Sequence, residues 1–217
     1  MLPCPSDLCF GYLLRHGATE NNLAKPPRLQ GRGLDSPLSS AGREQAEAAA
    51  HALSAAQLAA VFSSPLLRAR ETAEVIANPH ALSVQIVDDL IEVDVGQWEG
   101  RSWVEIARND AERHRQFVSE PDIHGYRGGE NLMQVRERVV PAIRQILTDH
   151  VGQNIASVAH NVVNRTYLAT LMGLGLARSR DLAQSNCGIN VIRYRGGEIK
   201  LLSMNSVFHL SDGVCSV

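Results

Sequence analysis

The chain has 217 residues, of which 44% are hydrophobic, and its formal net charge is -2. A chain of this length can bury one substantial core, so we expect a single domain over residues 1–217. The near balance of acidic and basic residues gives no reason to expect a nucleic acid partner. No apolar run approaches the roughly 18 to 20 residues of a membrane-spanning helix, and residues 1–10 lack the regions of a signal peptide, so we expect a cytoplasmic protein with no membrane partner.

Segments with the apolar pattern of strands alternate with helical segments along most of the chain. A strand is expected over 9–14, a helix over 39–53, a strand over 58–64 and a helix over 65–77. After a strand over 83–89 we expect helices over 103–117 and 131–150, a strand over 154–159 and a helix over 162–173. This alternation predicts an α/β fold, a three-layer sandwich with a mainly parallel central sheet and helices on both faces.

Three features are expected to depart from this regular alternation of strands and helices. Pro141 falls inside the long helix and predicts a kink or a break there. Residues 97–130 are rich in arginine, glutamate and glycine, and they are the best candidate for a small insertion that covers a site. Residues 189–204 are expected to form a hairpin that turns at Gly196 and Gly197.

The cysteines and histidines do not form the patterns of a metal site. The four cysteines, at positions 4, 9, 187 and 215, are scattered singly, so we expect reduced thiols. The eight histidines include no H-E-x-x-H or other close ligand pair. We therefore expect neither a metal nor another cofactor.

Polar side chains follow three of the expected parallel strands. Arg15 and His16 follow the first strand, Arg68 lies in the first turns of the helix after the second, and His160 follows the strand over 154–159. Because parallel strands end at the same edge of a sheet, where open α/β sheets bind ligands, these groups are expected to converge. The sequence therefore predicts a site with two arginines and two histidines.

Such a cluster suits a phosphate dianion. The guanidinium fork matches phosphate oxygens, and a neutral histidine can donate a hydrogen bond or attack phosphorus. Hydrolysis of a phosphate monoester also requires a proton for the departing alcohol, which a protonated carboxyl group can supply. Glu92 and Asp94 are both candidates for this acid, and their positions alone do not choose between them.

Four segments together resemble the histidine phosphatase superfamily, the phosphoglycerate mutase-like proteins. "LLRHGATENN" (13–22) is similar to the family signature R-H-G-x-T-x-x-N, and "SSPLLRARETA" (63–73) to its second arginine block. "LIEVDVGQWEG" (90–100) resembles the block that carries the acid, and "VAHNVVNR" (158–165) the block around the second histidine. These blocks occur in the family's order.

The resemblance implies a role for each matching residue. His16 would be the nucleophile and Glu92, in preference to Asp94, the proton donor. Arg15, Asn22, Arg68 and His160 would bind the phosphate, with Arg15, Arg68 and His160 also counted among the catalytic groups. Arg165 matches the family's helix arginine and is expected to be a structural anchor.

Two departures from the family pattern concern the shape of the site. Asn161 replaces the usual glycine after the second histidine, so either the local backbone changes or the amide reaches the ligand. The segment over 30–42 matches the family only with one extra residue, so that loop is expected to be reshaped.

The function that this resemblance implies is a metal-independent phosphatase that hydrolyses phosphate monoesters of small metabolites through a phosphohistidine intermediate. Two alternatives remain: a phosphoglycerate mutase, which passes the phosphoryl group to a second hydroxyl, and a non-catalytic protein that binds a phosphorylated ligand. The segment over 90–100 resembles the phosphatase branch and lacks the longer mutase-type segment. The partner would be a small phosphorylated metabolite, and a homodimer is common among the proteins it resembles.

Overall fold

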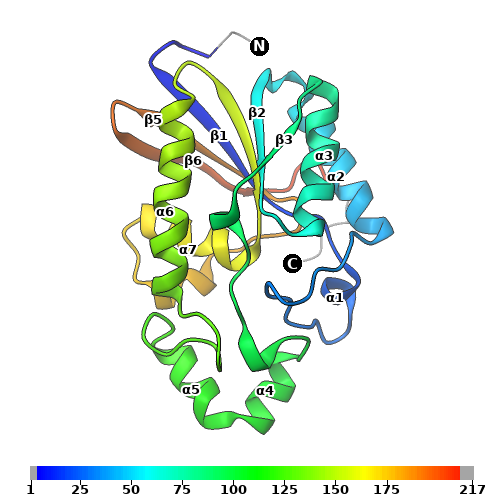
Figure 1. The fold of residues 1–217 in the computed structure, drawn as a ribbon, viewed down its shortest axis with the longest axis vertical. Coiled ribbons are helices and arrows are strands. Elements are labelled where there is room, and N and C mark those ends of the chain that lie inside the picture. The colour runs from blue at the N-terminus through cyan, green and yellow to red at the C-terminus, as the bar shows by residue number, and fades with distance from the viewer. Residues whose placement is uncertain (1–3, 211–217) are drawn as a thin grey trace.

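The computed structural model describes residues 4–210, and its strands form one sheet in the order β3-β2-β4-β1-β5-β6 (Figure 1). The strands are β1 (Leu8–Arg15), β2 (Leu58–Ser63), β3 (Val84–Ile86), β4 (Asn154–Ala159), β5 (Ile189–Arg195) and β6 (Glu198–Ser206). Strands β1 to β4 run parallel, β5 is antiparallel to β1, and β6 is antiparallel to β5. The predicted mainly parallel sheet is therefore confirmed.

The last two strands form the predicted hairpin. Gly196 and Gly197 occupy its turn with φ angles of 55° and 88°. These angles lie in the left-handed region that glycine adopts without a steric cost, so the two glycines permit this tight turn.

Helices cover both faces of the sheet. They are α1 (Glu20–Leu23), α2 (Ser40–Leu53), α3 (Leu67–Ala77), α4 (Trp103–Asn109), α5 (Ala111–Ser119), α6 (Leu132–Asp149) and α7 (Asn161–Leu171). Leu13 of β1 belongs to the core shared with α6 and α7, whereas Leu14, which points to the opposite face, belongs to the core shared with α2 and α3. The alternation of buried side chains along β1 thus builds the predicted three-layer sandwich (Figure 1).

Pro141 does not break the long helix: α6 continues through this residue as one helix. Pro141 is exposed, and its missing N–H removes one backbone hydrogen bond of the helix. Val135 and Val139 before it and Ile143 after it are almost fully buried on one stripe. Packing of this stripe against the sheet holds the helix together across the proline.

Residues 97–130 contain α4 and α5, which lie together at the end of the molecule where α1 and the start of α6 also lie (Figure 1). Trp98, near the start of this segment, is fully buried, and its ring centroid lies 5.6 Å from that of Phe117 and 5.9 Å from that of Tyr126. Its indole Nε1 donates a hydrogen bond of 2.9 Å to Asp110. These contacts hold the segment together, and Trp98, Ile106 of α4 and Phe117 of α5 belong to the same hydrophobic core as Leu13 of β1 and Val139 of α6, which attaches the segment to the main body.

Three of the cysteines, Cys4, Cys9 and Cys187, are free thiols, as expected, while Cys215 lies outside the described residues. Among the helices of residues 4–210, none has the length and apolar character needed to cross a membrane.

Candidate active site

The two histidines meet where the neighbouring strands β1 and β4 end. His16 follows β1, and its backbone N–H donates to the carbonyl of Ala159, the last residue of β4, at 3.0 Å. His160 comes next and caps helix α7. The ring centroids of His16 and His160 are 5.1 Å apart. The parallel pairing of β1 with β4 therefore brings the two imidazoles together, as the strand-end argument predicts.

Hydrogen bonds define the tautomer of His16. Its Nδ1 lies 2.7 Å from the carbonyl oxygen of Gly17, which can only accept, so Nδ1 carries the proton. Its Nε2 then holds the lone pair and accepts a hydrogen bond of 3.3 Å from Nε of Arg68. Burial, followed by the positive charges of Arg68 and Arg15, lowers the pKa of His16 well below 6.5. The ring is thus neutral near pH 7, with its basic nitrogen beside Arg68.

Arg68 is fully buried in the first turn of α3 and is held by the loop before α2. Its two terminal nitrogens donate to the carbonyls of Leu34 at 2.8 Å and Gly31 at 3.0 Å. Both acceptors lie in the segment with the extra residue relative to the family pattern. This loop therefore orients the guanidinium toward His16.

Arg15 ends β1 with a side chain that is partly free to bind a ligand. One terminal nitrogen donates to the carbonyl of Gln184 at 2.8 Å, whereas Nε is buried and has no hydrogen-bond partner among the described residues. Burial lowers the pKa of Arg15 to about 10, so the group stays charged at neutral pH.

His160 is fully buried and is oriented by Ser64, which follows β2. Its Nε2 lies 2.7 Å from the Ser64 hydroxyl, which also accepts a hydrogen bond from the backbone of Leu66. The hydroxyl proton is therefore available for Nε2 of His160, and the ring proton of the neutral imidazole then resides on Nδ1. Burial, with Arg68 as the next cause, lowers the pKa of His160 well below 6.5.

The two candidate acids lie in different environments. Glu92 is 4% exposed, and its oxygens accept backbone N–H groups of Val93 at 2.9 Å and Val162 at 3.3 Å. Burial raises the pKa of Glu92 above 4.5, which favours a protonated carboxyl group. Asp94 instead forms an ion pair with Arg32 at 2.6 Å on a partly exposed surface.

Asn22 lies in α1, and hydrogen bonds hold its side chain. Its Oδ1 accepts hydrogen bonds from the backbone and hydroxyl of Thr19, at 3.0 and 3.2 Å, and from Asn186 at 3.4 Å. Asn186 also donates to the carbonyl of His16 at 2.9 Å. With its oxygen occupied, Asn22 can offer a ligand its Nδ2 amide.

A cavity of about 220 Å³ lies in front of these groups. Its walls include the predicted site residues Arg15, His16, Asn22 and Glu92, together with Trp103 and Tyr126 from the segment over 97–130. Asp94, Arg68 and His160 are not among its walls, and Arg68 and His160 are fully buried. The remaining wall residues are Pro27, Arg28, Leu29, Gln30, Val93, Val95, Asn161, Val162, Arg165 and Asn186.

Several buried polar atoms at the site lack a hydrogen-bond partner among residues 4–210. They are Nε of Arg15, Nδ1 of His160, Oδ1 of Asn161 and Nε of Arg165. Buried polar groups in proteins are nearly always paired, so a ligand or water in the cavity can supply partners for those of these atoms that it reaches. Within the same residues, no group of three or more histidine, cysteine, aspartate or glutamate side chains is arranged to hold a metal ion.

The sequence prediction missed several residues that shape the site. Gln184 and Asn186 contact Arg15 and His16 from the segment before β5, and Ser64 orients His160. Gln184 and Asn186 lie outside the four segments that resemble the family, and nothing in the sequence pointed to them. Ser64 lies in the segment over 63–73, and the resemblance of that segment to the family's second arginine block was its available signal.

The fold, the two adjacent histidines and the neighbouring arginines define an α/β protein whose site suits a phosphoryl group. A sequence model of the histidine phosphatase superfamily, branch 1, matches residues 11–207, and the chain belongs to this family.

Individual relatives include proteins named for two activities. Phosphoserine phosphatase 1 of Hydrogenobacter thermophilus is 33% identical over 200 residues, which are 92% of this chain and 93% of that protein. The protein of Salmonella choleraesuis named "Probable phosphoglycerate mutase GpmB" is 30% identical over 184 residues, 85% of this chain and 84% of its own. The crystal structure of phosphoserine phosphatase from Entamoeba histolytica, in complex with 3-phosphoglyceric acid, matches 94% of this chain and 100% of its own, with a TM-score of 0.85 and 26% identity.

Proposed function

We propose that this protein is a metal-independent phosphatase that hydrolyses phosphate monoesters of small metabolites through a phosphohistidine on His16. Membership of the histidine phosphatase family and the similarity to named phosphatases support the class of reaction. The observation that carries the proposed chemistry is the neutral His16 ring, with Nδ1 bonded to the Gly17 carbonyl and the Nε2 lone pair beside a buried arginine.

In the first chemical step, Nε2 of His16 attacks phosphorus and the bond from phosphorus to the alcohol oxygen breaks. Positive charge from Arg15 and Arg68, with the Nδ1–H of His160 and the amide of Asn22, stabilises the equatorial oxygens of the transferring group. The unpaired Nε of Arg15 and Nδ1 of His160 support this assignment, because a phosphate would supply the acceptors they lack.

Glu92 serves as the acid and then as the base. Its protonated carboxyl gives a proton to the departing alcohol oxygen, and its carboxylate then takes a proton from the water that attacks the phosphohistidine. Hydrolysis releases inorganic phosphate and restores neutral His16. The raised pKa of Glu92 supports the first role, and the negative charge of a bound phosphate would raise this pKa further.

We also propose that residues 97–130 cover the site and limit the access of water to it. Trp103 and Tyr126 of this segment form part of the cavity wall. Exclusion of bulk water strengthens the electrostatic contacts to the phosphate.

Phosphate release from a panel of phosphorylated metabolites tests the proposed activity. With 3-phosphoglycerate, we expect free phosphate both with and without added 2,3-bisphosphoglycerate. A mutase would instead give isomerised phosphoglycerate with little free phosphate, and a non-catalytic binding protein would turn over nothing.

The covalent step is tested by rapid quench with labelled substrate. We expect an acid-labile phosphoprotein in the wild-type enzyme, and we expect His16→Ala to lose several orders of magnitude in turnover while its fold stays intact. His51→Ala, which removes an exposed histidine at the end of α2, is the matched control and should behave as wild type. Substantial turnover by His16→Ala would refute the assignment.

A further inference from the structure

Glu99 is a partly buried carboxylate that takes no part in the proposed chemistry. Its Oε1 accepts the backbone N–H of Gly31 at 2.6 Å, and its Oε2 accepts the backbone N–H of Gly33 at 3.0 Å. The carbonyls of Gly31 and Leu34, in the same short stretch, accept the two terminal nitrogens of Arg68. One carboxylate therefore holds the N–H groups of the backbone whose carbonyls hold the Arg68 guanidinium.

The two glycines of this loop permit the close approach of the carboxylate. A Cβ at Gly31 would lie 2.7 Å from the carbonyl oxygen of Val93 and 2.9 Å from Oε2 of Glu99. A Cβ at Gly33 would also lie 2.9 Å from that Oε2. Side chains at these positions would push the loop away from Glu99, so the sequence of the loop is adapted to this contact.

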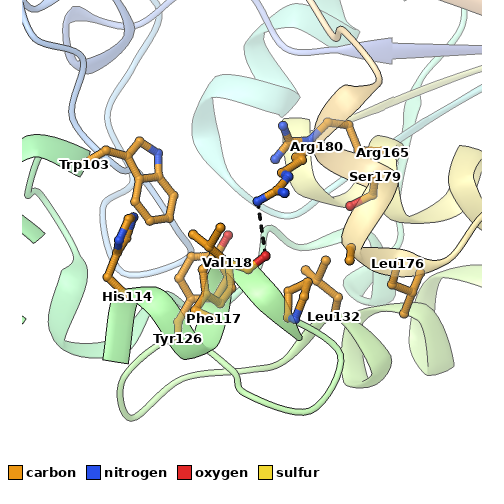
Figure 2. Close-up of a pocket in the computed structure, with 12 residues that line it drawn as sticks. Trp103, His114, Phe117, Val118, Tyr126, Leu132, Arg165, Leu176, Ser179 and Arg180 are labelled. Carbon is orange, nitrogen blue, oxygen red and sulfur yellow. Dashed lines mark hydrogen bonds between the residues drawn. The ribbon is translucent and has the colours of Figure 1, made fainter. Parts of the chain in front are cut away.

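Glu99 projects from a rigid base. It directly follows Trp98, whose fully buried ring packs against three aromatic rings with centroid separations of 6.0 Å to Trp103, 5.6 Å to Phe117 and 5.9 Å to Tyr126. Figure 2 shows these three side chains, which line a second cavity, of about 240 Å³. A backbone fixed by this packing can hold the carboxylate in one place.

The start of the loop is held without Glu99. The backbone N–H of Leu29 donates to the carbonyl of Arg101 at 2.8 Å, and the carbonyl of Leu29 accepts the backbone N–H of Gly100 at 2.9 Å. Loss of the Glu99 carboxylate would leave these backbone contacts in place. We therefore expect such a loss to displace the stretch over 31–34 without unfolding the protein.

Glu99 also lies within electrostatic reach of Arg68. Burial lowers the pKa of Arg68, and Asp35 and Glu99 are among the negative charges that oppose this lowering. Asp35 is exposed and accepts the backbone N–H of Leu67 at 2.6 Å, a hydrogen bond that an asparagine can also accept. Asp35→Asn therefore measures the effect of a lost charge alone.

We infer that Glu99 is a positioning residue for Arg68, which it keeps directed at Nε2 of His16 and at the phosphate by holding the loop over 31–34. This inference rests on the proposed function. Glu99 contacts none of the reacting atoms in that chemistry, so its effect passes through Arg68. A displacement of about 1 Å at a catalytic group can cost about 10²-fold in rate, and the first chemical step should show this loss.

A double-mutant cycle tests the inference. We expect Glu99→Ala to slow the first step about 10²-fold, measured by rapid quench in a single turnover of p-nitrophenyl phosphate. In an Arg68→Ala background the same change should cost no more than about 2-fold, because Glu99 then has no guanidinium to position. Glu99→Gln keeps an acceptor for the buried N–H of Gly31 and should lose less than Glu99→Ala.

Two control variants separate positioning from other effects. Glu71→Ala removes a partly buried carboxylate that accepts the backbone N–H of Leu38 at 2.7 Å. Leu38 lies in the same segment over 30–42, but among residues 4–210 Arg68 donates no hydrogen bond to it. We expect Glu71→Ala and Asp35→Asn to keep the wild-type rate.

Four outcomes would overturn the inference. The first is a wild-type rate in Glu99→Ala, and the second is an equal loss in both backgrounds, which would mean that Glu99 acts on the fold and not through Arg68. The third is the same loss in Glu71→Ala, which would mean a general loosening of the segment. The fourth is the same loss in Asp35→Asn, which would mean that charge alone is responsible. If Glu99→Ala fails to fold, Glu99→Gln completes the cycle with the same criteria.

Failure of the proposed function has a different signature. In that case the wild-type protein would release no phosphate from p-nitrophenyl phosphate or from the metabolite panel. Calorimetric binding of inorganic phosphate would then decide the inference, and Glu99→Ala should weaken binding in the wild-type background but not in the Arg68→Ala background. Equal weakening in both backgrounds would overturn the inference, and a wild-type protein that binds no phosphate would overturn it together with the proposed function.

Discussion

Replacement of Glu92 by glutamine tests whether Glu92, and not its neighbour Asp94, is the general acid. The two Glu92 oxygens accept the backbone N–H groups of Val93 and Val162 at 2.9 and 3.3 Å. Glutamine has one oxygen, so one of these buried donors would face an amide NH2 and lose its acceptor. An unpaired buried donor costs about 1 to 3 kcal/mol, and we expect Glu92→Gln to lower the free energy of unfolding by that amount.

The kinetic effect should depend on the leaving group. An alkoxide leaves poorly without a proton, whereas p-nitrophenolate needs little help. General acid catalysis contributes about 10²- to 10⁴-fold, so Glu92→Gln should slow alkyl phosphates more than p-nitrophenyl phosphate by a factor of that order.

Asp94→Asn is the matched control. Its ion pair with Arg32 is partly exposed, and such pairs contribute about 1 kcal/mol or less. We therefore expect a small change in stability and no dependence of the rate on the leaving group.

Rapid-quench measurement of the burst phase is the appropriate assay. If hydrolysis of the phosphohistidine limits turnover, both substrates slow alike in the steady state because Glu92 also acts as the base, and only the burst isolates the first step. A leaving-group-dependent loss in the burst of Asp94→Asn, and not of Glu92→Gln, would refute the assignment.

Four further predictions concern the pH dependence of activity and of stability, the packing of Gly42, and metals. Because burial and the neighbouring arginines lower the pKa values of His16 and His160 well below 6.5, both rings should stay neutral at pH 6.5, and kcat/KM should fall through their protonation only well below that pH. Because burial raises the pKa of Glu92, a decline of kcat/KM on its alkaline side should begin above pH 4.5 and disappear in Glu92→Gln. The two histidines should also make thermal stability fall below pH 6.5, since the unfolded chain binds protons there that the folded chain excludes; equal melting temperatures at pH 7 and pH 5.5 would contradict this. Although alanine favours helices, Gly42→Ala should lower the melting temperature, because the added Cβ would lie 2.0 Å from the backbone oxygen of Ala18. Gly175→Ala is the control and should leave the melting temperature unchanged, because a Cβ there has no neighbour within 4 Å. Activity should survive EDTA and be inhibited by vanadate, which adopts the five-coordinate geometry of the transferring group; a requirement for added magnesium would contradict the proposed mechanism.

The arrangement of Arg15, His16 and His160 could be predicted because parallel strands impose it. Once residues 9–14 and 154–159 are recognised as parallel strands, the residues that follow the two strands must lie at the same edge of the sheet. The choice of Glu92 over Asp94 needed the family resemblance, since two carboxylates two positions apart are equivalent in a sequence pattern. In the structure they separate, because Glu92 is buried at the cavity while Asp94 pairs with Arg32 at the surface.

The contributions of Gln184 and Asn186 could not be predicted in the same way. They reach Arg15 and His16 because β5 pairs antiparallel with β1, and the expected hairpin had no assigned neighbour in the sheet. A kink or a break at Pro141 was expected from local chemistry alone. The buried stripe of α6 overrides the loss of one hydrogen bond, and that stripe becomes visible only when the helix is placed on the sheet.

The position of β1 in the sheet has a consequence for how the chain acquires its structure. Its two neighbours are β4, which begins at Asn154, and β5, which begins at Ile189. The strand that carries Arg15 and leads into His16 therefore leaves the ribosome well before either of its partner strands has been made. Such distant pairing slows folding and leaves an apolar strand unpaired in the meantime. Nascent chains that end before β4 should consequently depend on chaperones and bind no phosphate.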